Sequence, residues 1–391
     1  MMGLESRDGI DKEGRGLPAS FPTVVKSGMA WTGKQIGETS DYIVKLESDD
    51  IAELERALET FKGLGLDGDA ISRDNFTLPG LGPRLEEVRW QVHEGRGFGL
   101  VRGLQVQKYG VEDLTMLYLG IQCYVANEYG RQDAKGNMLG EKAEARGRAN
   151  VTDKEANKCH DLRGTTVHII ADDSSEEKAT HQRHSTGSIV SEYQATFHNE
   201  ETGDIVSWLT RSTAAVGGQC VIASMHTVYN VLASSRPDLL GVLAQDDWPF
   251  VLPRVNFRPI LFHHDGRIVA NLSRASLWNK GQLSPLKNEA LDAVEHIARA
   301  TELHIPTQAG DVHFINNLVL LHRREGFSDG AGEHEQRHLV RMRLRDGELA
   351  WRPCAALERQ WREAFEMERG PVVWHLEPMP DGFFPLRAYA N

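Results

Sequence analysis

Two separated segments of the chain carry side chains that could bind a metal. His198 and Glu200 stand two positions apart, and His322 follows far downstream. Two imidazoles and one carboxylate supply three N/O donors, and a metal held by three protein donors keeps open coordination positions. This donor set is the 2-His-1-carboxylate triad of non-haem Fe(II) oxygenases. The sequence therefore predicts these three residues as metal ligands with a catalytic role.

The spacing of a histidine and an acidic residue is weak evidence when taken alone. With 16 His and 56 acidic residues in 391 positions, chance predicts about two such pairs. The chain contains three: the pair at His263 falls in a predicted turn, and the pair at His375 falls in a proline-rich tail. The pair at His198 is the best placed, although a surface histidine beside two glutamates at a strand end is the plainer interpretation.

Two arginines follow the downstream histidine on one predicted strand. Arg337 and Arg341 lie 15 and 19 residues after His322, and their spacing of four places them on the same strand face. Alternation favours the opposite face as core and leaves the arginines in solvent; that face carries His338, Val340, Met342 and Leu344. A functional alternative points them inward, where a dicarboxylate would satisfy the guanidinium groups. The pattern alone does not decide between the two.

The elements that must position these residues can be read from local signals. Apolar residues at helical spacing begin after Ser48 or Asp50 and end at Gly63, which predicts a helix. Asp265-Gly266 predicts a hairpin turn between strands 257–262 and 267–272. Further helices are expected at 85–92, 112–123, 224–233 and 285–300, and a buried strand at 98–101. The β segments are joined by turns and long crossovers, so we expect a mainly β fold with flanking helices, closed or sandwiched like a jelly roll.

Composition excludes several classes of protein. The balance of 44 basic against 56 acidic side chains gives a net charge of -12, which repels a phosphate backbone, so no nucleic-acid partner is expected. No stretch approaches the roughly 20 apolar residues that cross a bilayer. The expected location is therefore cytoplasmic, without membrane contact. The four cysteines form no C-x-x-C pair, which favours buried thiols over disulfides or a zinc site.

The domain organisation is expected to be simple. Residues 1–20 are predicted to be a flexible tail, and 21–391 a single domain with a polar insertion around 131–188. The insertion is expected to be a long surface loop. Alternatively it is a lid that carries Arg183 and His184 to the substrate. Oligomeric state is left open, a homo-oligomer included.

The chain resembles the TauD/TfdA superfamily of Fe(II)/2-oxoglutarate-dependent dioxygenases, particularly its fungal taurine-catabolism branch, over about residues 21–363. The motifs that carry the likeness are Ala30-Trp31-Thr32-Gly33, the helix 50–61, the segment 98–104, Phe197-His198-Asn199-Glu200 with 202–206, Gly217-Gly218 before Ala223-Ser224, Gly310-Asp311, Asn316-Asn317 with His322, and Arg337-His338-Leu339-Val340-Arg341.

The resemblance implies a double-stranded β-helix, which is a jelly-roll barrel, and it implies Fe(II), 2-oxoglutarate and O2 as cofactor and cosubstrates. It makes His198, Glu200 and His322 the iron ligands. It also implies that Arg337 pairs with the distal carboxylate of 2-oxoglutarate, and that Arg341 lies closer to the substrate.

Two positions depart from the pattern of that branch. Relatives mostly carry aspartate where this chain has Glu200, and Glu201 follows it, so Glu201 is an alternative ligand. Glutamate at this place resembles the clavaminate-synthase-like oxygenases, which act on amino acids and their derivatives. Cys220 stands where a hydroxyl residue often contacts 2-oxoglutarate, and it is a candidate cosubstrate contact.

The expected activity is oxidation of an aliphatic C–H bond in a small anionic substrate. An amino acid or an amino-acid-derived metabolite of secondary metabolism fits Arg341, and the outcome is hydroxylation, desaturation or oxidative cyclisation. The competing class is a non-catalytic barrel that binds a small acid or a protein partner without iron. A zinc hydrolase built on the same three ligands is a further alternative, but it leaves Arg337 unexplained.

Overall fold

The computed structural model describes residues 16–37, 39–131, 140–141, 159–160, 166–167, 196–251, 256–277, 283–332 and 335–366. Residues 1–15 of the predicted tail and most of the predicted insertion, with Arg183 and His184, lie outside the described residues. No helix of the described part is long and apolar enough to cross a membrane.

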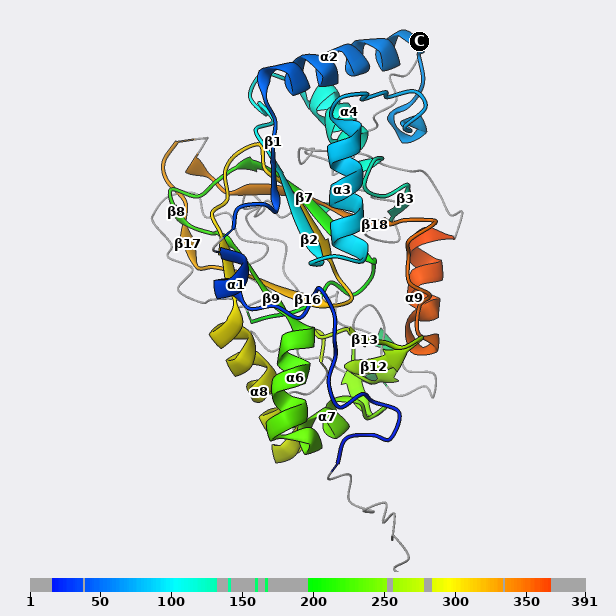
Figure 1. The fold of residues 1–391 in the computed structure, drawn as a ribbon, viewed down its shortest axis with the longest axis vertical. Coiled ribbons are helices and arrows are strands. Elements are labelled where there is room, and N and C mark those ends of the chain that lie inside the picture. The colour runs from blue at the N-terminus through cyan, green and yellow to red at the C-terminus, as the bar shows by residue number, and fades with distance from the viewer. Residues whose placement is uncertain are drawn as a thin grey trace, which may run out of the picture.

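The largest sheet holds the strands that lead to the site (Figure 1). Its order is β1 (Ile43–Lys45), β2 (Phe98–Arg102), β15 (Val312–Asn316), β7 (Ile205–Ser212), β18 (His338–Arg345) and β3 (Glu128–Gly130), with β4 (Gly140–Glu141) also on β18. The pair β1–β2 is parallel, and the other pairs of this sheet are antiparallel. Neighbouring strands are thus far apart in sequence, and residues of both halves of the chain meet on one face.

A smaller antiparallel sheet packs on the inner face of the large one. It consists of β14 (Leu303–Ile305), β9 (Cys220–Ser224) and β16 (Leu320–Arg324). One apolar cluster joins the two sheets: it includes Leu100, Val206 and Ile315 of the large sheet with Ile222 and Leu320 of the small one. The two sheets are therefore layers around a shared interior.

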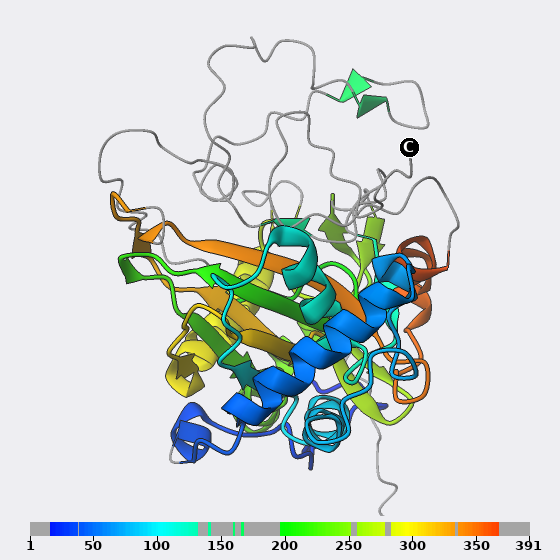
Figure 2. The same cartoon turned by 90° about the horizontal axis from the view of Figure 1, so that it is seen from above.

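Helices cover the two outer faces. On the large sheet, α2 (Ser48–Gly63), α3 (Gly82–His93) and α4 (Val111–Gln122) bury their apolar sides against β2, β7, β15 and β18, and Figure 2 shows α2 lying across this layer. On the small sheet, α6 (Met225–Ser235), α7 (Pro237–Leu243) and α8 (Pro285–Thr301) form the other layer. The predicted β core with flanking helices is confirmed at this level.

The remaining described elements are short, apart from helix α9. They are α1 (Gly33–Gly37), the 3-10 helix Gly68–Ala70, β5 (Cys159–His160), β6 (Thr166–Val167), β8 (Val216–Gly217), β10 (Trp248–Phe250), β11 (Asn256–Arg258), β12 (Leu261–His264), β13 (Arg267–Ala270), β17 (Phe327–Ser328) and the C-terminal helix α9 (Ala355–Phe365).

Local signals predicted α2, α3, α4, α6 and α8 close to their observed bounds, but they did not predict α7 or α9. Ser224 and Ser284 cap α6 and α8, each accepting a hydrogen bond from a backbone N–H three residues on. The start of α2 differs from the prediction, because Glu47 is the N-cap and donates its backbone N–H to the Asp50 carboxylate. The hairpin turn at Asp265 is confirmed, with left-handed backbone there and at Gly266. Its first strand is shorter than predicted, since residues 256–258 pair with β10 instead.

Candidate metal centre

The two histidines meet across an isolated antiparallel bridge at the edge of the small sheet. The backbone N–H of His198 donates to the carbonyl of His322 at 3.0 Å, and the return bond is 2.9 Å. This pairing brings the two imidazole ring centroids to 4.4 Å. Glu200 lies two residues beyond the bridge, and its Oε1 is 3.6 Å from Nε2 of His322. The predicted convergence of the three side chains is therefore present.

The geometry of the three donors fits a metal ion. One ligand atom from each of His198, Glu200 and His322 lies within 4.8 Å of the others. Bonds of about 2.1 Å to a metal place adjacent donors about 3 Å apart, so the side chains need to close by less than about 2 Å. His198 Nδ1 lies 2.9 Å from the carbonyl of Thr196. A neutral imidazole that donates from Nδ1 keeps the lone pair of Nε2 for a metal.

A buried asparagine holds the backbone of the glutamate. Asn317 is fully buried, and its Oδ1 accepts from the N–H of Glu200 at 2.8 Å. Its Nδ2 donates to the carbonyls of Glu200 and Gly203 at 3.0 and 2.9 Å. Asn317 lies on the turn between β15 and β16, so the strand that carries His322 is tied directly to the loop that carries Glu200.

The residue between His198 and Glu200 is a second buried asparagine, which holds this segment in place. The Asn199 side chain donates to the carbonyls of Asn317 and Leu320 at 2.8 and 3.1 Å and accepts from the N–H of Leu272 at 2.9 Å. Asn199 is 2% exposed. The side chain between the ligands therefore points away from the metal position and fastens the segment to the core, which leaves His198 and Glu200 on the opposite side.

The arginines of β18 form a series of ion pairs with the segment that follows the first ligand. Arg341 contacts the Glu200 carboxylate, and Arg343 Nη2 lies 3.1 Å from Glu201 Oε2. The two interpretations of β18 are each right in part. Val340 and Met342 belong to the core under the outer helices, as alternation predicts. Arg341 and Arg343 are nevertheless not in solvent. They face carboxylates inside the fold.

The same ion pairs show which of the two glutamates is the better candidate ligand. Glu200 faces both histidines, whereas Glu201 is turned to Arg343 and is not part of the three-residue group. Burial alone would lower the pKa of Arg341, but the adjacent Glu200 and Glu201 carboxylates raise it above its ordinary value. Arg341 is thus a fixed cation directly beside the candidate centre.

Arg337 lies beside the glycine turn that precedes β9. Its Nε donates to the carbonyl of Gly218 at 3.3 Å, and its guanidinium is 5.5 Å from the centre of the Phe327 ring. Gly218 has φ +75°, and a Cβ there would come within 3.0 Å of Arg337 Cδ, so glycine permits the close approach. Cys220 follows on the same strand and is buried in the cluster between the sheets.

Comparison with known proteins identifies the family. The family model described as taurine catabolism dioxygenase TauD, TfdA family, matches residues 60–343. The chain belongs to this family. A taurine hydroxylase-like protein of Stachybotrys chartarum is 31% identical over 370 residues, which are 90% of this chain and 88% of that protein.

Solved structures share the TauD-like fold. An asparagine oxygenase in complex with Fe(II), 3-hydroxyasparagine and succinate aligns with a TM-score of 0.55 at 15% identity, over 78% of this chain and 93% of that one. The non-haem iron oxygenase OrfP in complex with Fe and alpha-ketoglutaric acid aligns with a TM-score of 0.52 at 13% identity, over 77% and 93%. As a TauD/TfdA-family member, the protein is a non-haem Fe(II)- and 2-oxoglutarate-dependent dioxygenase. The predicted family, enzyme class and cofactors are confirmed.

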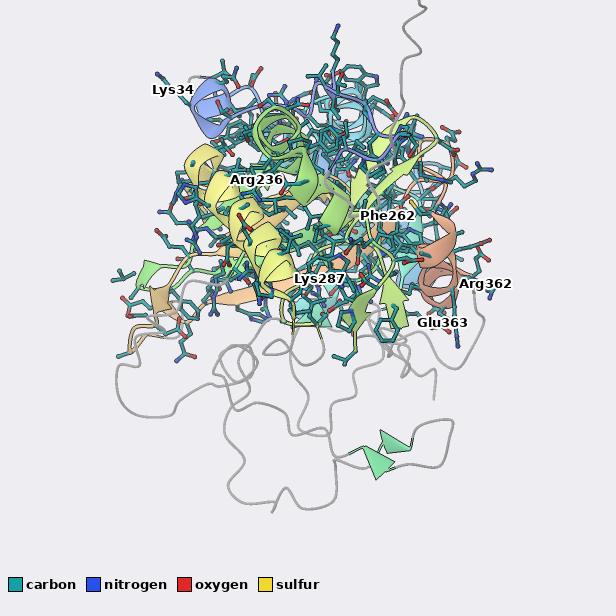
Figure 3. All side chains as sticks on the ribbon, turned by 90° about the horizontal axis from the view of Figure 1, so that it is seen from below. Lys34, Arg236, Phe262, Lys287, Arg362 and Glu363 are labelled. Carbon is teal, nitrogen blue, oxygen red and sulfur yellow. The ribbon has the colours of Figure 1, made fainter. Side chains whose placement is uncertain are left out.

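Sequence reasoning left several supporting residues without a role. Trp208 lies with its ring centroid 5.6 Å from that of His322. Asp204 is buried, accepts a hydrogen bond from Trp361 Nε1, and has its pKa raised by burial to about 7. Helix α9 thereby reaches the loop after Glu200, while its Arg362 is exposed (Figure 3). The Asn316-Asn317 pair was a visible signal, but its partners are distant in sequence.

Proposed function

We propose that His198, Glu200 and His322 hold the Fe(II) of this TauD/TfdA-family enzyme, and that the enzyme oxidises an aliphatic C–H bond of a small anionic substrate. The single observation that carries the proposal is the convergence of two imidazoles and one carboxylate within 4.8 Å, in a chain whose family uses this chemistry. The chemistry supplied by bound metal and cosubstrate is O2-dependent C–H oxidation, with 2-oxoglutarate decarboxylated to succinate.

The residues of this chain bind, orient and exclude water. His198 Nδ1–H donates to the carbonyl of Thr196 and thereby keeps Nε2 directed at the metal position. Trp208 and the apolar residues between the sheets keep bulk water away from His322. The proposed double-stranded β-helix, formed by the two packed sheets of a single domain over 21–391, is the frame that holds these groups in place.

Arg337 is proposed to anchor the distal carboxylate of 2-oxoglutarate. Support comes from its place. Arg337 lies at the Gly218 turn and immediately precedes β18, the strand that carries Arg341, and Arg341 contacts Glu200. A guanidinium binds a carboxylate through two parallel N–H donors. Cys220, on the adjoining strand, contributes to the wall of this site.

Arg341 is proposed to set the charge of the substrate. It is a half-buried cation whose present partner is the Glu200 carboxylate. A metal ion bound to Glu200 would neutralise part of the negative charge of that carboxylate. Arg341 could then pair with an anionic group of a substrate beside the metal position. Substrates with a carboxylate or sulfonate therefore fit best, and an amino acid or amino-acid-derived metabolite is the leading class. The relatives named above, an asparagine oxygenase and a taurine hydroxylase-like protein, support this class.

A screen for substrate-dependent succinate release tests the activity. The Fe(II) enzyme is incubated with O2, 2-oxoglutarate and panels of amino acids, sulfonic acids and uncharged analogues, and products are identified by mass spectrometry. We expect release stimulated by members of the anionic panels, with a mass change of hydroxylation, desaturation or ring closure, and no stimulation in His322→Ala. Stimulation only by uncharged compounds would contradict the assignment of Arg341.

A further inference from the structure

A buried histidine faces the interior between the two sheets. His313 lies on β15, where its register partners are Leu100 on β2 and Trp208 on β7. The side chain is 1% exposed, and neither Nδ1 nor Nε2 has a hydrogen-bond partner among the described residues. An unpaired polar group at such a position carries a desolvation cost, which a bound ligand would offset.

A buried hydroxyl on the neighbouring strand, that of Thr210, also lacks a hydrogen-bond partner among the described residues. Thr210 stands two residues beyond Trp208 on β7, so both side chains point to the same inner face. It is 1% exposed, and its Oγ1 has no hydrogen-bond partner within the described part of the chain. Its register partner on β18 is Leu339, two residues after Arg337.

The ring of Trp208 packs against both His313 and the proposed ligand His322. The ring of Trp208 is 5.3 Å from that of His313, nearly parallel to it, and 5.6 Å from that of His322. His313 is therefore separated from a proposed ligand by the width of one indole. Burial lowers the pKa of His313 to about 4, and the charge of Arg337 acts in the same direction. The imidazole is neutral near pH 7 and offers one N–H donor.

We propose that His313 and Thr210 complete a carboxylate site with Arg337, and that this site receives the distal carboxylate of 2-oxoglutarate. The inference rests on the proposed function. The guanidinium supplies the charge, while the imidazole N–H and the hydroxyl donate to the carboxylate oxygens. Cys220, at the nearby place where a hydroxyl was expected, is a weak donor. His313 and Thr210, on strands of the large sheet, supply the hydrogen-bond donors that the Cys220 thiol lacks.

The test separates recognition of the distal carboxylate from general effects. Dissociation constants are measured by anaerobic titration of the Fe(II) enzyme, following the visible charge-transfer band, for 2-oxoglutarate and for 2-oxobutyrate, which has no distal carboxylate. We expect His313→Phe and Thr210→Val to bind 2-oxoglutarate about 10- to 100-fold more weakly, while binding of 2-oxobutyrate and of Fe(II) stays unchanged. His313→Gln, which keeps an N–H donor, should recover part of the loss.

His93→Phe is the matched control, because His93 is 2% exposed and lies on α3, on the outer side of the same sheet. It should leave both dissociation constants unchanged. Equal loss of both oxo acids in His313→Phe, or wild-type binding of 2-oxoglutarate in His313→Phe and Thr210→Val, would overturn the inference. If His313→Phe does not fold, Thr210→Val and His313→Gln decide it. A charge-transfer band retained in His322→Ala would instead contradict the proposed ligand set.

Discussion

Replacing Asn317 with alanine should weaken metal binding although the residue is not itself a ligand. The substitution removes three hydrogen bonds of 2.8, 3.0 and 2.9 Å that hold Glu200 and Gly203. At about 1 kcal/mol net for each bond, we expect a loss of about 3 kcal/mol in the free energy of unfolding. The Glu200 carbonyl keeps a weaker bond from Asn271 at 3.3 Å, so the loop remains attached but is less constrained. Loss of such support typically costs 10- to 100-fold in metal affinity.

Asn230→Ala is the matched control for this prediction. Asn230, on α6, makes two comparable bonds to the backbone of Val25, at 2.7 and 2.9 Å, far from Glu200 in sequence and on the outer helical layer. It should lose about 2 kcal/mol of unfolding free energy and bind metal normally. Stability is measured by urea unfolding of the metal-free proteins, and affinity by anaerobic Fe(II) titration calorimetry. If Asn317→Ala is destabilised but binds Fe(II) with wild-type affinity, the asparagine does not position the ligand.

Three further predictions concern the ion pairs and a buried carboxyl. Arg341→Gln should raise the substrate KM at least tenfold, whereas Arg352→Gln, at a side chain 72% exposed, should not; equal effects in steady-state assays would refute a substrate role. Glu200→Gln should abolish Fe(II) binding measured by calorimetry while Glu201→Gln retains it, and the reverse result would make Glu201 the ligand. Burial raises the pKa of Asp204 from 3.8 to about 7, so the folded state holds a proton that the unfolded chain releases between these values, and stability from this group falls as pH rises through that window. When the pH is raised from about 5 to about 7, the unfolding free energy of Asp204→Asn should therefore fall less than that of the wild type. Parallel pH profiles of the two proteins in urea unfolding would contradict this.

Local chemistry made some elements predictable from sequence. The caps of α6 and α8 lie next to the helices they start, and the turn at Asp265 needs only two adjacent residues with left-handed backbone. The candidate ligands could also be named, because histidine and carboxylate at this spacing, followed by a distant histidine, are typical of one kind of metal site once the flanking motifs are considered together.

The side-chain networks of the site could not be predicted in this way. Alternation along β18 identified a core face at Val340 and Met342, but the fate of Arg341 depends on where Glu200 lies, 141 positions earlier in the chain. Asn317 likewise acts through hydrogen bonds to a segment 117 residues away. Such contacts are set by how strands from the two halves of the chain pair, and no local pattern encodes that pairing.

The central claim, that His198, Glu200 and His322 together hold iron, is tested most directly by an anaerobic visible spectrum. Fe(II) and 2-oxoglutarate are added to the wild-type protein and to single alanine variants of the three residues, with His304→Ala, at a side chain 47% exposed, as the control. We expect the charge-transfer band of the iron–cosubstrate chelate in the wild type and the control, and its loss in each of the three variants. An undiminished band in any of those three would contradict the account.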